Sequence, residues 1–164
     1  TASKASLRRD ATMHTIALAD CPVVPWRNGG GTTRELLAWP AAEDWQVRVS
    51  VAEIAADGPF SPYPGIDRWF AVLDGHGVVL TLPQGERVLR PGDAPLAFAG
   101  EAAPACRLID GPTRDLNLML RRGARAPWHG VFADGTLHWS DDPHQRLPAT
   151  RGWRLSSASM ERIP

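Results

Sequence analysis

The sequence predicts an all-β fold of antiparallel strands joined by short loops. Gly and Pro each occur 15 times in the 164 residues, which leaves little room for long helices. Short apolar segments bounded by turn residues recur roughly every ten residues, a spacing typical of β-sandwiches and barrels. The length is sufficient for one domain with a sizeable core.

The clearest strand pattern covers residues 45–51. The apolar residues from Trp45 to Val51 alternate with polar residues that include Arg48 and Ser50. A strand with one apolar and one polar face is therefore expected here. Two strands separated by a turn are also expected in each of three further segments: 68–85, 86–100 and 106–123.

Composition divides the chain into three parts. We expect residues 1–13 to be a disordered extension, with Met13 at or near the natural start. A barrel domain is expected over residues 14–140. The segment 141–164 is polar and lacks a clear period, which predicts an irregular or partly disordered tail.

Charge and cysteine content exclude several classes of function. Eighteen basic residues balance eighteen acidic ones, so no overall field attracts nucleic acid or an anionic membrane. No apolar run approaches the ~20 residues of a membrane-spanning helix, and the first residues do not resemble a secretory signal. Cys21 and Cys106 have no metal-site spacing, so two buried, reduced thiols in a cytoplasmic protein are expected.

The glycine run in "PWRNGGGTTRE" (25–35) raises the question of phosphate binding. A Walker-type loop needs a lysine followed by Ser or Thr, and this segment has none. The preferred interpretation is a turn over residues 28–30 and a strand over 32–39. Thr33, Glu35 and Leu37 would share one face of that strand, opposite Arg34 and Leu36. The alternative is that the glycines only shape a hairpin.

Several phrases together resemble the HutD/Ves family. They include "PWRNGGGTTRE" (25–35), "VRVSVAEIAADGPFSPYPGIDR" (47–68) and "DGPTRDLNLMLRR" (110–122). The resemblance implies a cupin-like double-stranded β-helix, or bicupin-like barrel, with a pocket at its mouth. It also implies an association with bacterial histidine utilisation, and a small-molecule-binding or regulatory role more than an established enzymatic one.

Neither a metal site nor a nucleophile is indicated. None of the five histidines forms the His-x-His pair that cupins use for metals. No G-x-S-x-G elbow is present. The prediction is a protein without metal or cofactor.

Polar residues in the family-like phrases are the candidate ligand contacts. An arginine fork meets a carboxylate with two hydrogen bonds, so arginines at a barrel mouth would select a small acid. The alternative is that each arginine is exposed and paired with a nearby acid. The candidate set is Trp26, Asn28, Arg34, Glu35, Arg48, Ser50, Ser61, Asp67, Arg68 and Asn117.

Three functions remain open from the sequence. The first is a metal-free binding protein for a small carboxylate such as N-formylglutamate, with a regulatory or buffering role. The second is a cupin-type isomerase or hydrolase that uses Glu35 or Asp67 as general acid or base. The third is an interaction module whose unpaired strand edge binds a partner or a second copy, and a homodimer is the expected assembly.

Overall fold

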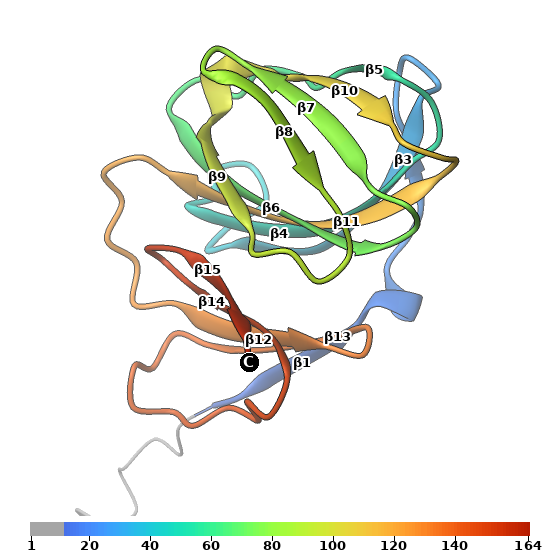
Figure 1. Cartoon of the computed structure of the whole chain (residues 1–164). Coiled ribbons are helices and arrows are strands. Elements are labelled where there is room, and N and C mark those ends of the chain that lie inside the picture. The colour runs from blue at the N-terminus through green and yellow to red at the C-terminus, as the bar shows by residue number, and fades with distance from the viewer. Residues whose placement is uncertain (1–11) are drawn as a thin grey trace, which may run out of the picture.

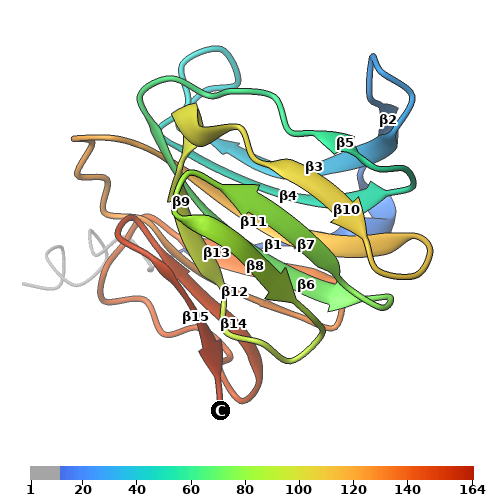
Figure 2. The same ribbon diagram turned by 45° about the horizontal axis from the view of Figure 1, so that its top comes forward.

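Three antiparallel β-sheets stack as layers in the computed structural model, which describes residues 12–164 (Figures 1 and 2). A six-stranded sheet is the central layer. A four-stranded sheet covers one of its faces and a five-stranded sheet covers the other, each across its own hydrophobic core. The fold is all-β and cupin-like, as the sequence predicts.

The central sheet has the strand order β2-β3-β4-β11-β6-β9. Its members are β2 (Val24–Pro25), β3 (Gly31–Trp39), β4 (Val47–Ile54), β6 (Ile66–Asp74), β9 (Leu96–Ala99) and β11 (Thr113–Arg121). Four long strands, β3, β4, β11 and β6, form its middle. They carry most of the residues described below.

The four-stranded sheet faces the central sheet to complete a barrel. Its order is β5-β10-β7-β8, with β5 (Gly58–Pro59), β7 (Val78–Leu82), β8 (Gly85–Leu89) and β10 (Ala105–Leu108). The core between the two sheets includes Phe70, Leu80 and Cys106. Cys106 and Cys21 are both free and buried, as expected.

The five-stranded sheet packs beneath the central sheet in the order β1-β13-β12-β14-β15. Its members are β1 (His14–Ala17), β12 (His129–Ala133), β13 (Thr136–Ser140), β14 (Gly152–Ser156) and β15 (Met160–Ile163). Two short 3₁₀ helices, η1 (Leu18–Asp20) and η2 (Gly100–Ala102), join elements elsewhere.

The C-terminal segment differs from the irregular tail expected over 141–164. It contributes β14 and β15, and β14 pairs with β12, so the sheet crosses the expected boundary at residue 140. Leu155 and Met160 are buried in the lower core. The strands are short, with too few apolar residues to show a period. The expected N-terminal extension lies almost entirely outside the described residues.

Alternation in the central strands separates the two cores. Val47, Val49 and Val51 of β4 pack in the lower core with Leu116 and Leu118 of β11. The intervening side chains point into the barrel, because successive strand residues face opposite sides. The two faces predicted for residues 45–51 are confirmed from Val47 onward, whereas Trp45 and Gln46 precede the strand.

A β-bulge in β3 changes the expected facing of one residue. Glu35 pairs with Ser50, but Leu37 pairs with Val49, so Leu36 is the extra residue. Leu37 therefore packs with the lower core rather than sharing the barrel face with Glu35. The expectation that Thr33, Glu35 and Leu37 share one face is wrong for Leu37.

The glycine run makes the tight turn from β2 into β3. Gly29 has φ +75°, in the left-handed region that favours glycine. The Asn28 side chain accepts a hydrogen bond from the Gly30 amide at 2.8 Å. A Cβ at Gly31 would collide with the Glu53 carbonyl oxygen. The run thus lets the turn form and lets β3 approach the end of β4.

Candidate functional site

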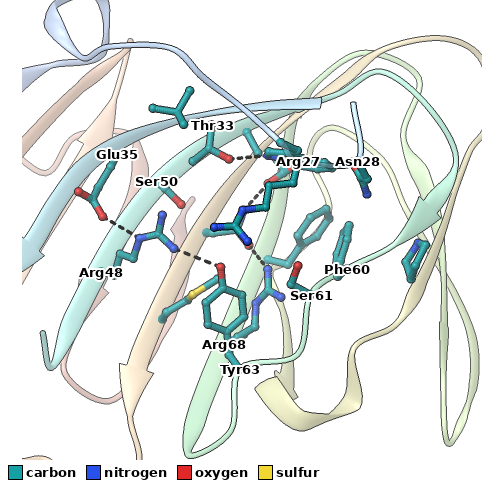
Figure 3. Close-up of a pocket in the computed structure, with 18 of the residues that line it drawn as sticks. Arg27, Asn28, Thr33, Glu35, Arg48, Ser50, Phe60, Ser61, Tyr63 and Arg68 are labelled. Atoms are coloured by element: carbon teal, nitrogen blue, oxygen red, sulfur yellow. Dashed lines mark hydrogen bonds and ion pairs between the residues drawn. The ribbon is translucent and has the colours of Figure 1, made fainter. Parts of the chain in front are cut away.

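A pocket of about 480 Å³ opens between the central sheet and two loops of the barrel (Figure 3). Strands β3, β4, β11 and β6 form one wall. The loops over residues 24–28 and 59–63 form the rest of the rim. The pocket therefore lies at the barrel mouth, where the resemblance places it.

Strand register sets the side chains of this wall in rows. One row crosses the sheet as Glu35, Ser50, Asn117 and Phe70. The neighbouring row is Arg48, Met119 and Arg68. Two arginines therefore stand on either side of one methionine, within a sheet whose strands are about 4.8 Å apart.

Eight of the ten sequence-predicted residues line this pocket. They are Trp26, Asn28, Glu35, Arg48, Ser50, Ser61, Arg68 and Asn117. The sequence pattern did not single out Asp115, Tyr63, Phe60, Met119 or Arg27, which also line it. Asp115 precedes Asn117 by two residues, so strand alternation alone would have placed it on the same face.

Arg34 and Asp67 do not line the pocket. Arg34 points to the other face of β3, where it donates to the Leu18 carbonyl oxygen at 3.2 Å. Asp67 accepts from Arg122 at 2.9 Å, in a cluster that includes Glu101. Asp67 and Arg68 are neighbours on β6, so their side chains point to opposite faces, and only Arg68 points into the barrel.

Arg68 is the most enclosed cation of the pocket. Its residue is 5% exposed, and its guanidinium lies over the rings of Phe60, Tyr63 and Phe98 at 5.2–5.4 Å. It donates from Nη2 to the Asn117 side-chain oxygen at 2.9 Å. Burial lowers the pKa of Arg68 to about 10, against the opposing effect of Asp115, so the group stays charged at neutral pH.

Asp115 lies beside this cation without forming an ion pair among the described residues. The residue is 0% exposed, and one carboxyl oxygen, Oδ1, accepts from the Asn117 amide. Asn117 thus bridges Arg68 and Asp115. Burial raises the pKa of Asp115 to about 8, although Arg68 and Asn117 act in the opposite direction.

Two buried polar atoms at the pocket floor have no partner in the described structure. They are Arg68 Nε and Asp115 Oδ2. A buried polar group without a hydrogen bond costs about 1–3 kcal/mol. Both atoms belong to residues that line the cavity.

Arg48 is held differently, nearer the rim. Its Nε donates to Glu35 at 2.8 Å and its Nη1 donates to the Tyr63 hydroxyl at 3.4 Å (Figure 3). Glu35 neutralises most of this charge. The Arg27 side chain also projects over the pocket (Figure 3). Arg68 is the most buried of these three arginines, and it forms no ion pair in the described structure.

Hydrogen bonds hold the rim of the pocket in place. Trp26 Nε1 donates to Thr33 at 2.7 Å, which orients the indole beside the cavity. The amides of Phe60 and Tyr63 donate to the carbonyl oxygens of Pro104 and Gly100, each at 2.9 Å. A loop held in this way loses little entropy when a ligand binds.

Comparison with known proteins identifies the family. The sequence model of HutD matches residues 18–147. The chain belongs to the HutD family.

Relatives and solved structures agree with this assignment. A Pseudomonas putida protein named for its place in the hutC 3′ region is 39% identical over 130 residues, which cover 76% of this chain and 66% of that protein. Protein Ves of Cronobacter sakazakii is 40% identical over 102 residues, 62% of this chain and 56% of Ves. The chain spans less than two thirds of the length of these two relatives.

The structure of HutD from Pseudomonas fluorescens SBW25 superposes with a TM-score of 0.74 at 28% identity, covering 83% of this chain and 91% of that one. A conserved protein of unknown function from Pseudomonas aeruginosa PAO1 superposes with a TM-score of 0.73 at 23% identity, covering 92% and 95%. The second likeness concerns the fold alone.

The pocket of this HutD-family chain differs from a metal-binding cupin site. All five histidines lie in the described part of the chain, and none lines the pocket. Across residues 12–164, no three His, Cys, Asp or Glu side chains gather closely enough to hold a metal ion. Over the same residues, no helix is long and apolar enough to cross a membrane.

Proposed function

We propose that this HutD-family protein binds a small carboxylate in the pocket at the barrel mouth, without a metal, in a regulatory or buffering role in the cytoplasm. The observation that carries the proposal is Arg68, a buried charged guanidinium with an Nε–H that lacks a partner. An anion supplies both the missing acceptor and the missing charge.

The remaining lining favours a small acid with an apolar body. Trp26, Phe60, Phe70 and Met119 surround the cavity, while Ser50 and Ser61 offer hydroxyl groups. The volume of about 480 Å³ falls in the range of small-molecule sites. N-formylglutamate fits this chemistry, and the histidine-utilisation association implied by the family makes it the first acid to test.

A thermal-shift panel tests the proposal. It pairs acids (acetate, glutamate, N-formylglutamate and urocanate) with the uncharged amides acetamide and glutaramide. A ligand at a hundred times its dissociation constant adds about 2.7 kcal/mol, which raises Tm by several degrees. We expect at least one acid to raise Tm and neither amide to do so. An equal response to acids and amides, or no response to any acid, contradicts the proposal.

Arg34→Ala is the matched control for this panel. Arg34 is an arginine of the same strand region that points away from the pocket. The variant should show the wild-type response to carboxylates, whatever its own Tm. A lost response in Arg34→Ala would place the ligand on the other face of β3.

Enzymatic function is the second candidate, and one observation gives it a specific residue. Asp115 is a buried acid with a pKa raised to about 8, as general acids and bases often are. Asp67 lies outside the pocket and Glu35 is paired with Arg48, so Asp115 is the better candidate. NMR of the ligand before and after incubation separates the two functions, because a binding protein returns its ligand unchanged.

A further inference from the structure

Asp115 has a feature that carboxylate binding by Arg68 does not by itself explain. It is a fully buried acid, and Asn117 Nδ2 donates to only one of its oxygens, Oδ1. The other oxygen, Oδ2, is buried without a partner at the pocket floor, as is Arg68 Nε. Arg68 and Asp115 are linked by hydrogen bonds through Asn117, and each of them has one buried polar atom without a partner.

Arg68 and Asn117 favour the ionised form of Asp115, but the opposing effect of burial is larger. From β6, Arg68 is the facing cation, but Asn117 stands between it and Asp115, and these two residues form no ion pair in the described structure. From β4, Arg48 forms an ion pair with Glu35 of β3. From β10, Cys106 is a neutral thiol, because burial and the nearby Asp115 raise its pKa to about 12. Tyr63 adds a phenol from the rim.

An ionised Asp115 would also repel the ligand. Arg68 and Asp115 both line the pocket and are linked through Asn117, so a carboxylate bound at Arg68 lies near Asp115. Two negative carboxylates at close range disfavour each other, and one of them then holds a proton. A protonated Asp115 instead offers an O–H donor to the ligand oxygen that Arg68 does not occupy.

We infer that Asp115 acts as a neutral acid that donates its O–H to the bound carboxylate, beside the Nε–H of Arg68. The inference rests on the proposed function and names the residue that determines its specificity: the floor presents two donors, the Arg68 Nε–H and the Asp115 O–H, which match the two oxygens of a carboxylate. At a pH where Asp115 is ionised in the free protein, binding of the carboxylate brings one proton from solvent onto Asp115. The proton and the carboxylate carry opposite charges, so the net charge of the pocket does not change on binding.

Isothermal titration calorimetry counts this proton. The probes are N-formylglutamate and acetate, each titrated at about pH 6 and about pH 9.5, in two buffers that differ in ionisation enthalpy. We expect near-zero proton uptake at the lower pH and about one proton per ligand at the higher pH. The affinity should fall about tenfold per pH unit above the pKa of Asp115.

Asp115→Asn is the matched variant, because its amide keeps the shape and a donor but cannot titrate. It should bind both probes at about pH 6 within a few-fold of wild type, and take up no proton at either pH. Asp115→Ala, which lacks the donor, should bind more weakly at both.

Each outcome separates the inference from the proposed function. Binding of either probe to the wild-type protein with no proton uptake at about pH 9.5 overturns the role of Asp115 and leaves carboxylate binding intact. Uptake that persists in Asp115→Asn also overturns it, since another group then carries the proton. Binding of neither probe at either pH overturns both.

Discussion

Replacing Arg68 by methionine should lower the affinity for carboxylates by roughly a hundredfold or more. A hydrogen bond to a charged group contributes about 1.5–3 kcal/mol, and each 1.4 kcal/mol is a factor of ten in affinity. Arg68 is 5% exposed, so water weakens its contact with an anion little. Titration calorimetry with N-formylglutamate measures the change.

The control is Arg114→Met. Arg114 lies on β11 outside the pocket and is paired with Asp74 on the surface, so this variant should bind like wild type. Methionine at position 68 keeps the contact with Phe60, Tyr63 and Phe98, which protects folding, and circular dichroism verifies it. A folded Arg68→Met protein with wild-type affinity would rule out Arg68 as the anchor.

Replacing Asp115 by asparagine should stabilise the unliganded protein at neutral and alkaline pH. The pKa of Asp115 is raised from its ordinary 3.8 to about 8 in the folded protein, so the folded state holds this proton more tightly than the unfolded chain. The contribution of Asp115 to the free energy of unfolding is therefore greatest below about pH 4. It falls as pH rises toward 8, and above that pH Asp115 causes no further change.

The asparagine variant removes this loss because its side chain does not titrate. Each pKa unit corresponds to about 1.4 kcal/mol, so at pH 8 the variant should exceed wild type by a few kcal/mol. That is a rise in Tm of several degrees, measured by thermal unfolding across pH. The advantage should grow between about pH 4 and 8.

Asp44→Asn serves as the exposed comparison, since its side chain is 90% exposed. Its stability should stay within about 0.5 kcal/mol of wild type, with no growth across this pH range. If Asp115→Asn shows the same flat profile, Asp115 is not a neutral acid in the folded protein.

The fold was predictable from local patterns because strand alternation is a short-range signal. The valines of β4 show the two faces directly, and they place Arg48 and Ser50 in the barrel. The tail was not predictable in this way. Leu155 and Met160 are isolated apolar residues in polar surroundings, and only pairing of β14 with β12 gives them a core.

The candidate site was predictable where side-chain direction was fixed by alternation, and less so where it depended on packing. Arg34 looked equivalent to Arg48, but it faces the other side of the sheet and caps a carbonyl oxygen. Leu37 lies on the opposite face from the one expected, because β3 contains a bulge that its amino-acid sequence does not reveal. The raised pKa of Asp115 depends on burial by distant strands, which no single segment displays.

The most direct test of carboxylate capture at Arg68 is NMR of isotope-labelled arginine side chains during addition of N-formylglutamate. The Nε–H signal of Arg68, assigned by its loss in Arg68→Lys, should shift strongly as a new hydrogen bond forms. The signals of Arg34 and Arg114 should stay in place. Saturable binding that leaves the Arg68 Nε–H signal unchanged would contradict the assignment of this pocket.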